Sequence, residues 1–237
     1  MRSLLYATTV PITKSISIRV PSVGEIWDDE ENYFNVISTI IATPYDMMVQ
    51  LDDQGIDFTK ITDFDLFLLL FQRLQTMDTK LVFGDLNLSN FRVASNQISG
   101  EFVLRDDLSD IIIDKPAYTQ ICMTLRTILS IPRTDKVPGN EEARQYMIKL
   151  ARRKQKRHSN QKRESQLEKY IVALVNTEQF PYNYSTVRDI SIFQFYSSLN
   201  QIAHKIRFDN VMIGYYAGTV KGEDLRAGEK TWIKSGE

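Results

Sequence analysis

Two segments near the start of the chain have the composition of strands, and the second alternates apolar and polar residues, which is the pattern of a half-buried strand. Residues 4–10 and 15–20 are predicted to form two strands with a turn at 11–14 between them. On the second strand, one face is expected to hold Ile16, Ile18 and Val20. The same period returns between residues 81 and 114. There it predicts a meander or a pair of hairpins, with short strands at 81–83, 91–93, 101–104 and 110–113 and turns at 96–100 and 106–109.

Between and after these strands, apolar residues recur every three or four positions, which predicts helices. The predicted helices begin near residues 28, 45, 62 and 115, and Pro44 and Pro132 lie beyond the ends of the first and last. The third helix, Phe64–Leu74, is capped by Thr62 or Asp63 and has little polar surface, so we expect it at the centre of the core.

Helical periodicity continues in the second half of the chain but is interrupted by a polar stretch. Asn140 is a good N-cap, and an apolar stripe of Ala143, Met147, Leu150 and Ala151, with Tyr146 beside it, follows. From 152 to 166 there is no aliphatic or aromatic residue. This stretch forms either the polar waist of one long helix or a mobile basic linker between two helices. The stripe then resumes at Leu167.

The last strong helical pattern lies between residues 187 and 206, and its apolar positions are expected to be core. They are Val187, Ile190, Ile192 or Phe193, Phe195, Tyr196, Leu199, Ile202, Ala203 and Ile206. Residues 211–217 are predicted as a final helical turn. The tail that follows is polar apart from Trp232 and Ile233, and Trp232 is a candidate anchor for a partner's pocket.

These patterns predict an α+β fold in which hairpins and a meander are mixed with helices in the N-terminal part. The C-terminal part is predicted to be all-helical, with a long basic connector helix. The proposed divisions are a mixed domain over 1–133, a helical domain over 134–220 and a polar tail over 221–237. Two prolines and a glycine between 132 and 140 favour that first boundary.

The charge distribution changes the picture most, because eight basic residues lie within fifteen positions without an acid among them. They are Lys149, Arg152, Arg153, Lys154, Lys156, Arg157, Lys162 and Arg163. The chain holds 29 basic and 30 acidic residues, so outside the run 21 bases face 30 acids, a net charge of −9. The run is interpreted as a solvated helix face, a contact with an acidic protein surface, or a nucleic-acid contact.

Candidate catalytic and metal-binding groups do not form a recognisable site in the sequence. The Asp52–Asp53 pair lacks the spacing of a calcium loop, because its glycine comes too early and no Glu closes the loop. Cys122 lies in an apolar helical pattern, where a buried, inert thiol is expected. We therefore expect no enzyme activity, no cofactor and no metal. The single cysteine excludes an internal disulfide, and the longest apolar run is too short to span a membrane.

Three segments carry a resemblance to proteins encoded among the tail genes of phages and prophages of Gram-positive bacteria. They are ISIRVPSVGEI at 16–26, PYDMMVQLDD at 44–53, and LVNTE at 174–178 followed by IFQFY at 192–196. The layout also resembles tail-assembly chaperones and baseplate-hub assembly proteins, which begin with a β-rich segment and continue into helices that bind other tail proteins.

The resemblance implies a non-enzymatic protein that binds other phage tail or baseplate proteins. It would act in the host bacterial cytoplasm during assembly, or in the virion tail. Self-association is an open alternative, because the acidic remainder of one copy could neutralise the basic run of another. The rival class is a nucleic-acid-binding regulator that uses residues 149–163.

Overall fold

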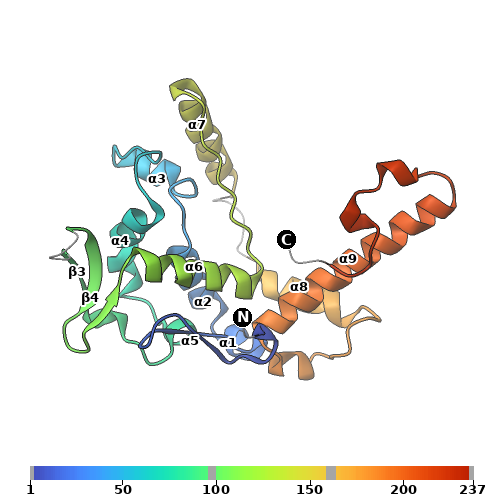
Figure 1. Ribbon diagram of the computed structural model, residues 1–237, viewed down its shortest axis with the longest axis horizontal. Coiled ribbons are helices and arrows are strands. Elements are labelled where there is room, and N and C mark those ends of the chain that lie inside the picture. Colours follow the sequence, from blue (N-terminus) through green and yellow to red (C-terminus); the bar gives the residue numbers. More distant parts are fainter. Residues whose placement is uncertain (1–2, 96–99, 159–163, 235–237) are drawn as a thin grey trace.

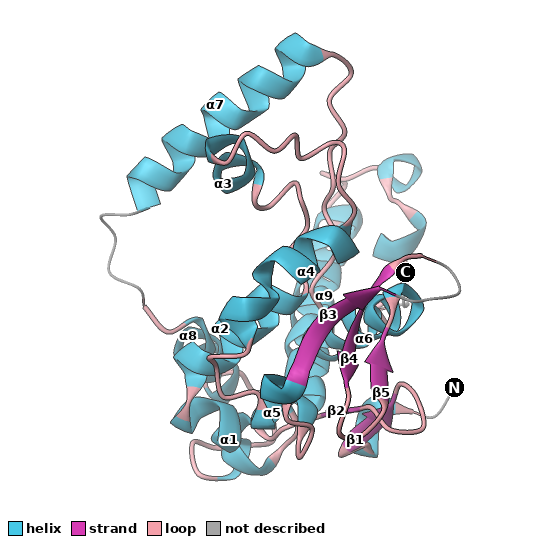
Figure 2. Ribbon diagram, turned by 90° about the vertical axis from the view of Figure 1, so that its left-hand side faces the viewer, coloured by secondary structure: helices cyan, strands magenta, loops and turns pink. Residues whose placement is uncertain are grey.

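The computed structural model describes residues 3–95, 100–158 and 164–234, and the fold is mixed α+β as the sequence predicts. The described strands form two small antiparallel sheets, and helices make up most of the rest (Figures 1 and 2). The strands are β1 (Thr9–Pro11), β2 (Ser17–Arg19), β3 (Phe91–Ser95), β4 (Phe102–Asp106) and β5 (Ile111–Ile113). The helices are α1 (Val23–Asp28), α2 (Glu30–Ile40), α3 (Met48–Asp53), α4 (Asp63–Leu74), α5 (Lys80–Phe83), α6 (Lys115–Leu129), α7 (Glu141–His158), α8 (Gln166–Val175) and α9 (Ile192–Tyr216).

Both predicted strand groups form with the expected antiparallel pairing. In the first sheet, β1 pairs with β2 from Thr9↔Arg19 to Pro11↔Ser17. The three apolar side chains on the predicted face, at positions 16, 18 and 20, are all buried. In the second sheet, β4 lies between β3 and β5. The predicted turn at 96–100 falls largely outside the described residues.

The main core is built around α4 and α6, as the apolar content of residues 64–74 predicts. Thr62 caps α4, since its hydroxyl accepts a hydrogen bond from the Asp65 amide and the Asp65 carboxylate accepts one from the Thr62 amide. The Phe67 ring stacks on Tyr118 of α6 at a centroid distance of 4.5 Å. The Tyr118 hydroxyl donates to the Ile40 carbonyl at 3.0 Å, which ties α6 to the end of α2.

The same hydrophobic cluster includes buried residues on both sides of the predicted boundary near 133. From the second half of the chain it takes in Leu167, Leu174, Val187 and Phe195, with α8 and α9 as the main contributors. The packing of these residues against those of α2, α4 and α6 brings the C-terminal helices onto the N-terminal core. The division at 133 stays a prediction.

Three local predictions were wrong. Residues 81–83, predicted as a strand, lie in α5, which buries Val82 and Phe83 and ends at Gly84 with a positive φ of 64°. Most of residues 4–10 is not strand, because Leu4–Tyr6 forms a 3₁₀ turn before β1. The helix predicted from residue 28 begins two residues later, as α2, and a further helix, α1, forms at 23–28 where none was predicted; Asp29, with φ −145° and ψ 47°, separates the two.

The structure also distinguishes between the two possibilities for the polar waist. Ser165 has non-helical backbone and caps α8 by accepting a hydrogen bond from the Glu168 amide, so α7 and α8 are separate helices. The predicted cap of α7 is confirmed, because the Asn140 side-chain oxygen accepts from the Ala143 amide at 2.8 Å. The last helix begins and ends later than predicted, because α9 starts at Ile192, after Val187 and Ile190, and includes Gly214. Of the predicted core positions, Ala203 and Ile206 are exposed.

Candidate functional site

The basic run lies on α7, which projects from the body of the protein. Figures 1 and 2 both place α7 at the outer end of the molecule, next to α3 and away from the two sheets. A second, smaller hydrophobic cluster holds it there. The buried members of that cluster are Ala42, Met48, Val49, Leu51, Phe58, Leu66 and Ile148, and only Ile148 comes from α7.

One face of α7, which we call the inner face, packs on α3 and consists of Arg144, Ile148, Ala151 and Arg152. Their spacing of four, three and one places them on one side of a helix. Ile148 is 3% exposed, and Ala151 packs beside it against the same cluster. The two arginines lie on either side of this apolar contact. The inner face therefore fixes α7 to the fold.

Both inner-face arginines are neutralised by carboxylates. Arg152 contacts Asp52 at 2.8 Å and Asp53 at 2.5 Å, at the end of α3. Arg144 lies 3.5 Å from Asp57 and 2.6 Å from Glu141. The Asp52–Asp53 pair, which the sequence interpretation rejected as a calcium loop, thus holds the basic helix.

The pKa shifts of these groups follow the contacts. The hydrogen bonds that Arg152 donates to Asp52 and then to Asp53 raise the pKa of Arg152. The hydrogen bonds that Arg144 donates to Glu141 raise the pKa of Arg144. In return, hydrogen bonds from Arg144 and then from Gln145 lower the pKa of Glu141 to about 2. Arg144, Arg152 and Glu141 therefore stay charged at neutral pH.

The opposite side of α7 is exposed and carries the rest of the described basic residues. Four of them have exposed side chains: Lys149, Arg153, Lys154 and Arg157. We call the outer face the set Glu142, Tyr146, Lys149, Leu150, Arg153 and Arg157, with Lys154 at its edge. Two of its members are large and apolar, yet Tyr146 is 62% exposed and Leu150 is 44% exposed.

The structure thus divides the eight predicted contact residues. Arg152 faces α3 and is ion-paired, so its assignment to a partner contact is not supported by its position. Lys156 is also exposed on α7. Lys162 and Arg163 lie outside the described residues. The structure brings five members of the run together on the exposed side of one helix.

The candidate anchor Trp232 lies in a tail that folds back on α9. Its carbonyl accepts a hydrogen bond from the Gln201 side chain at 2.7 Å, and the Lys234 amide donates to the same glutamine at 3.0 Å. The carbonyl of Thr231 lies 2.9 Å from Nε2 of His204. The Trp232 side chain is 52% exposed, so the tail backbone is fixed while its indole stays accessible.

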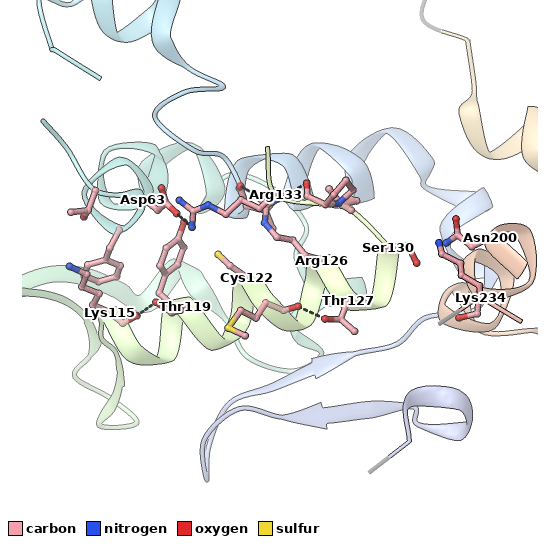
Figure 3. A pocket seen from close by; sticks show the side chains of 18 of the residues that line it. Asp63, Lys115, Thr119, Cys122, Arg126, Thr127, Ser130, Arg133, Asn200 and Lys234 are labelled. Atoms are coloured by element: carbon pink, nitrogen blue, oxygen red, sulfur yellow. Dashed lines mark hydrogen bonds and ion pairs between the residues drawn. The ribbon is translucent and has the colours of Figure 1, made fainter. Parts of the chain in front are cut away.

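A broad groove of about 1770 Å³ runs along α6 between the start of α4, residues 131–133 and the tail (Figure 3). The guanidinium groups of Arg126 and Arg133, which line it, make contacts within the fold. Arg126 donates to the Ile41 carbonyl at 2.6 Å and to the Pro132 carbonyl at 3.2 Å, and Arg133 contacts Asp63 at 2.9 Å. The hydroxyls of Thr119 and Thr127 donate to carbonyls of their own helix.

Cys122, which lines this groove, has a thiol whose reactivity is lowered by its burial. Burial raises the pKa of the Cys122 thiol to about 11, so the thiol is protonated at neutral pH. Within residues 3–95, 100–158 and 164–234, no group of three or more His, Cys, Asp or Glu side chains is placed to hold a metal ion. None of the helices in that same part of the chain is long and apolar enough to cross a membrane.

The sequence predicts only part of the attachment of α7 to the fold, since Met147 and Ala151 of the predicted stripe do pack against the smaller cluster. The apolar stripe predicted for this helix contains Leu150, which is exposed, and omits Ile148, which is its one buried side chain. The available signal was the i, i+4, i+7, i+8 spacing of Arg144, Ile148, Ala151 and Arg152. That face mixes two arginines with two apolar residues, so a search for apolar periodicity alone does not find it.

Residues 155–236 match the family model described as the YomV second domain. The match covers α8, α9 and the tail with the end of α7, which is less than half of the chain. It points to a phage-derived protein of the Bacillus prophage type and names no tail or baseplate role. No curated protein and no solved structure matches the chain.

Proposed function

We propose that this protein is a bacteriophage structural or assembly protein, and that the outer face of α7 is its contact surface for another protein. The observation that carries the proposal is the division of charge on α7. The inner-face arginines are neutralised by carboxylates of α3 and its neighbours, whereas Lys149, Arg153, Lys154 and Arg157 face solvent. Folding therefore accounts for the inner charges but not for the outer ones.

An acidic protein surface suits the outer face better than a nucleic acid does. A phosphate backbone would be repelled by Glu142, which shares this face with the cations. Tyr146 and Leu150 are also exposed there, and aromatic residues are enriched at the centres of protein interfaces. A face with both charges and two exposed apolar side chains is typical of a protein contact. The family match supports a phage-derived protein, and the resemblance to tail-gene proteins supports tail or baseplate assembly as the setting of this contact.

The test is a variant in which the four exposed cations are changed to Gln: Lys149→Gln, Arg153→Gln, Lys154→Gln and Arg157→Gln. A matched control removes four exposed positive charges elsewhere through Lys14→Gln, Lys80→Gln, Lys136→Gln and Lys230→Gln. Each set is placed in the phage or prophage that carries the gene, and infectious particles are counted. We expect the α7 variant to lower the yield and the control to leave it unchanged.

A parallel titration with duplex DNA at physiological salt separates the rival class. We expect weak DNA binding that differs little between the wild type and the α7 variant. Submicromolar DNA binding that disappears in the α7 variant would replace the protein-contact proposal with a nucleic-acid function. A normal particle yield from the α7 variant would refute the assignment of the contact to α7.

A further inference from the structure

The outer face of α7 has opposite charges at its two ends and apolar side chains between them. Glu142 is in the first turn, Arg153 and Arg157 are in the last turns, and Tyr146 and Leu150 lie between them. At 3.6 residues per turn, these five residues lie roughly 120–200° around the helix from the buried Ile148. They form one continuous stripe, about 22 Å from Glu142 to Arg157 at 1.5 Å per residue.

From this stripe we infer that the outer face of α7 binds the outer face of α7 in a second copy of this chain, with the two helices antiparallel. This inference deepens the proposed function and rests on it, because it names the partner of the same surface. We place the two-fold axis between Lys149 and Leu150. In antiparallel pairing about this axis, two residues lie opposite each other when their residue numbers add up to 299.

In this register, each outer-face residue meets a chemically complementary one. Glu142 lies opposite Arg157 of the second copy, which pairs a carboxylate with a guanidinium at both ends of the contact. Tyr146 lies opposite Arg153 of the second copy, so the guanidinium can stack on the aromatic ring. Leu150 lies opposite Lys149 of the second copy, whose methylene stem can cover it. A two-fold axis makes every one of these pairs occur twice.

The position of α7 in the fold leaves room for a second helix. Its inner face is covered by α3, while Figures 1 and 2 place the helix at the outer end of the molecule. Tyr146 and Leu150 are 62% and 44% exposed in the single chain, so pairing would cover apolar surface that the fold leaves open. A contact of one helix pair is small for a stable interface, so we expect a dissociation constant of roughly micromolar size.

A charge swap tests both the partner and the register. Glu142→Arg brings two arginines together at each end of the contact, and Arg157→Glu brings two glutamates together. Each single variant should weaken dimerisation at least about tenfold, because like charges placed opposite each other repel. The double variant Glu142→Arg/Arg157→Glu restores opposite charges and should regain dimerisation to within about threefold of the wild type.

The double variant also separates a restored contact from a change in helix stability. Arg near the start of a helix and Glu near its end both oppose the helix dipole, so the double variant should weaken α7 more than either single variant does. Recovery of dimerisation in the double variant therefore comes from the interface. Lys14→Glu, in the β1–β2 turn, changes the net charge as Arg157→Glu does and should dimerise as the wild type does.

The measurement is sedimentation velocity on the full chain from about 1 to about 300 μM, at about 50 mM and about 500 mM NaCl. Circular dichroism confirms that each variant is folded. We expect a dimer that weakens at high salt, fails in the single variants and returns in the double variant. A monomer throughout the wild-type series, or single variants that dimerise normally, would overturn the inference. So would a double variant that fails to recover.

Failure of this inference can be told apart from failure of the proposed function. If the wild type stays monomeric while the four-Gln variant still lowers particle yield, the outer face of α7 binds a different protein and only the inference falls. If the four-Gln variant gives a normal particle yield, the proposed function falls, whatever the sedimentation result.

Discussion

Removing the side chain of Ile148 should release α7 from the fold while leaving the main core intact. Ile148 is 3% exposed and is the only buried α7 residue in the smaller hydrophobic cluster. Large-to-small changes of buried Ile cost about 2–5 kcal/mol. Because this cluster is small and lies at the edge of the molecule, we expect Ile148→Ala to cost about 3 kcal/mol, toward the lower end of that range.

The magnitude can be measured in two ways. If the chain unfolds as one unit, the melting temperature should fall by about 6–12 °C, since each kcal/mol shifts a chain of this size by about 2–4 °C. If the α3–α7 region opens by itself, hydrogen exchange of the α7 amides should speed up about 150-fold, while the α4 amides keep their protection. Ile148→Val, which leaves most of the side chain, should cost only about 0.5–1.5 kcal/mol.

The matched control is Tyr146→Ala, which removes a larger side chain from the exposed side of the same helix. It should change the stability of the single chain by no more than about 0.5 kcal/mol. If Ile148→Ala costs no more than Tyr146→Ala, then α7 is not held by its inner face. The assignment of its outer face to a partner would then lose its basis.

Three further outcomes are expected from the structure. Phe195→Ala should destabilise the protein by about 3–5 kcal/mol in urea unfolding because Phe195 is fully buried, while Leu199→Ala should cost less because that side chain is only half-buried. Equal costs for the two would contradict the burial difference. The Glu141 pKa is depressed from 4.5 to about 2, so its pairing should stabilise the protein above pH 4.5 and lose that effect as the pH falls through about 2. Unfolding midpoints of the wild type and Glu141→Gln should therefore differ most near neutral pH, and a difference that grows with acidification would have the wrong sign. Iodoacetamide should label Cys122 in the folded protein much more slowly at pH 8 than in urea, because a pKa of about 11 leaves about a hundredfold less thiolate than the usual value of 9. Equal labelling rates would show that burial does not protect the thiol.

The elements that the sequence predicts well are those in which one period covers the whole segment. Residues 15–20 alternate without a break, so their buried face could be predicted correctly. The helix at 64–74 has apolar residues on most sides, so its place in the core could be predicted, although Leu69 is 56% exposed. Residues 81–83 are three apolar residues in a row, a pattern without a period, and it favoured a strand where the chain forms α5. The exposure of Ile206 has a related cause: the stripe of α9 continues in the sequence after the helix has left the core.

The attachment of α7 could not be predicted from local pattern, because its partners are distant in the sequence. Arg152 donates a hydrogen bond to Asp52, which lies 100 positions earlier in the sequence. In the sequence, Arg152 belongs to the basic run and Asp52 to an acidic pair. Neither pattern shows that the two side chains contact each other. Met147 and Ala151 of the predicted stripe do pack in the smaller cluster, but Ile148 lies beside them between Arg144 and Arg152, and the predicted stripe includes Leu150 in its place. Only tertiary packing shows that this polar-looking side of the helix is the buried one.

The basic run is therefore not one functional unit, because the helix turns its members to different sides. Charge counted along the sequence includes Arg152, whose carboxylate partners belong to the same chain. Charge counted on the outer face includes Glu142, which gives that face a direction: negative at its start and positive at its end. A uniformly basic surface would accept any acidic partner, but a face with two opposite ends prefers a partner that runs the other way. The outer face also lies almost wholly before residue 155, where the family match begins. Its partner must therefore be determined on this chain itself, and it cannot be transferred from other proteins that share only the matched segment.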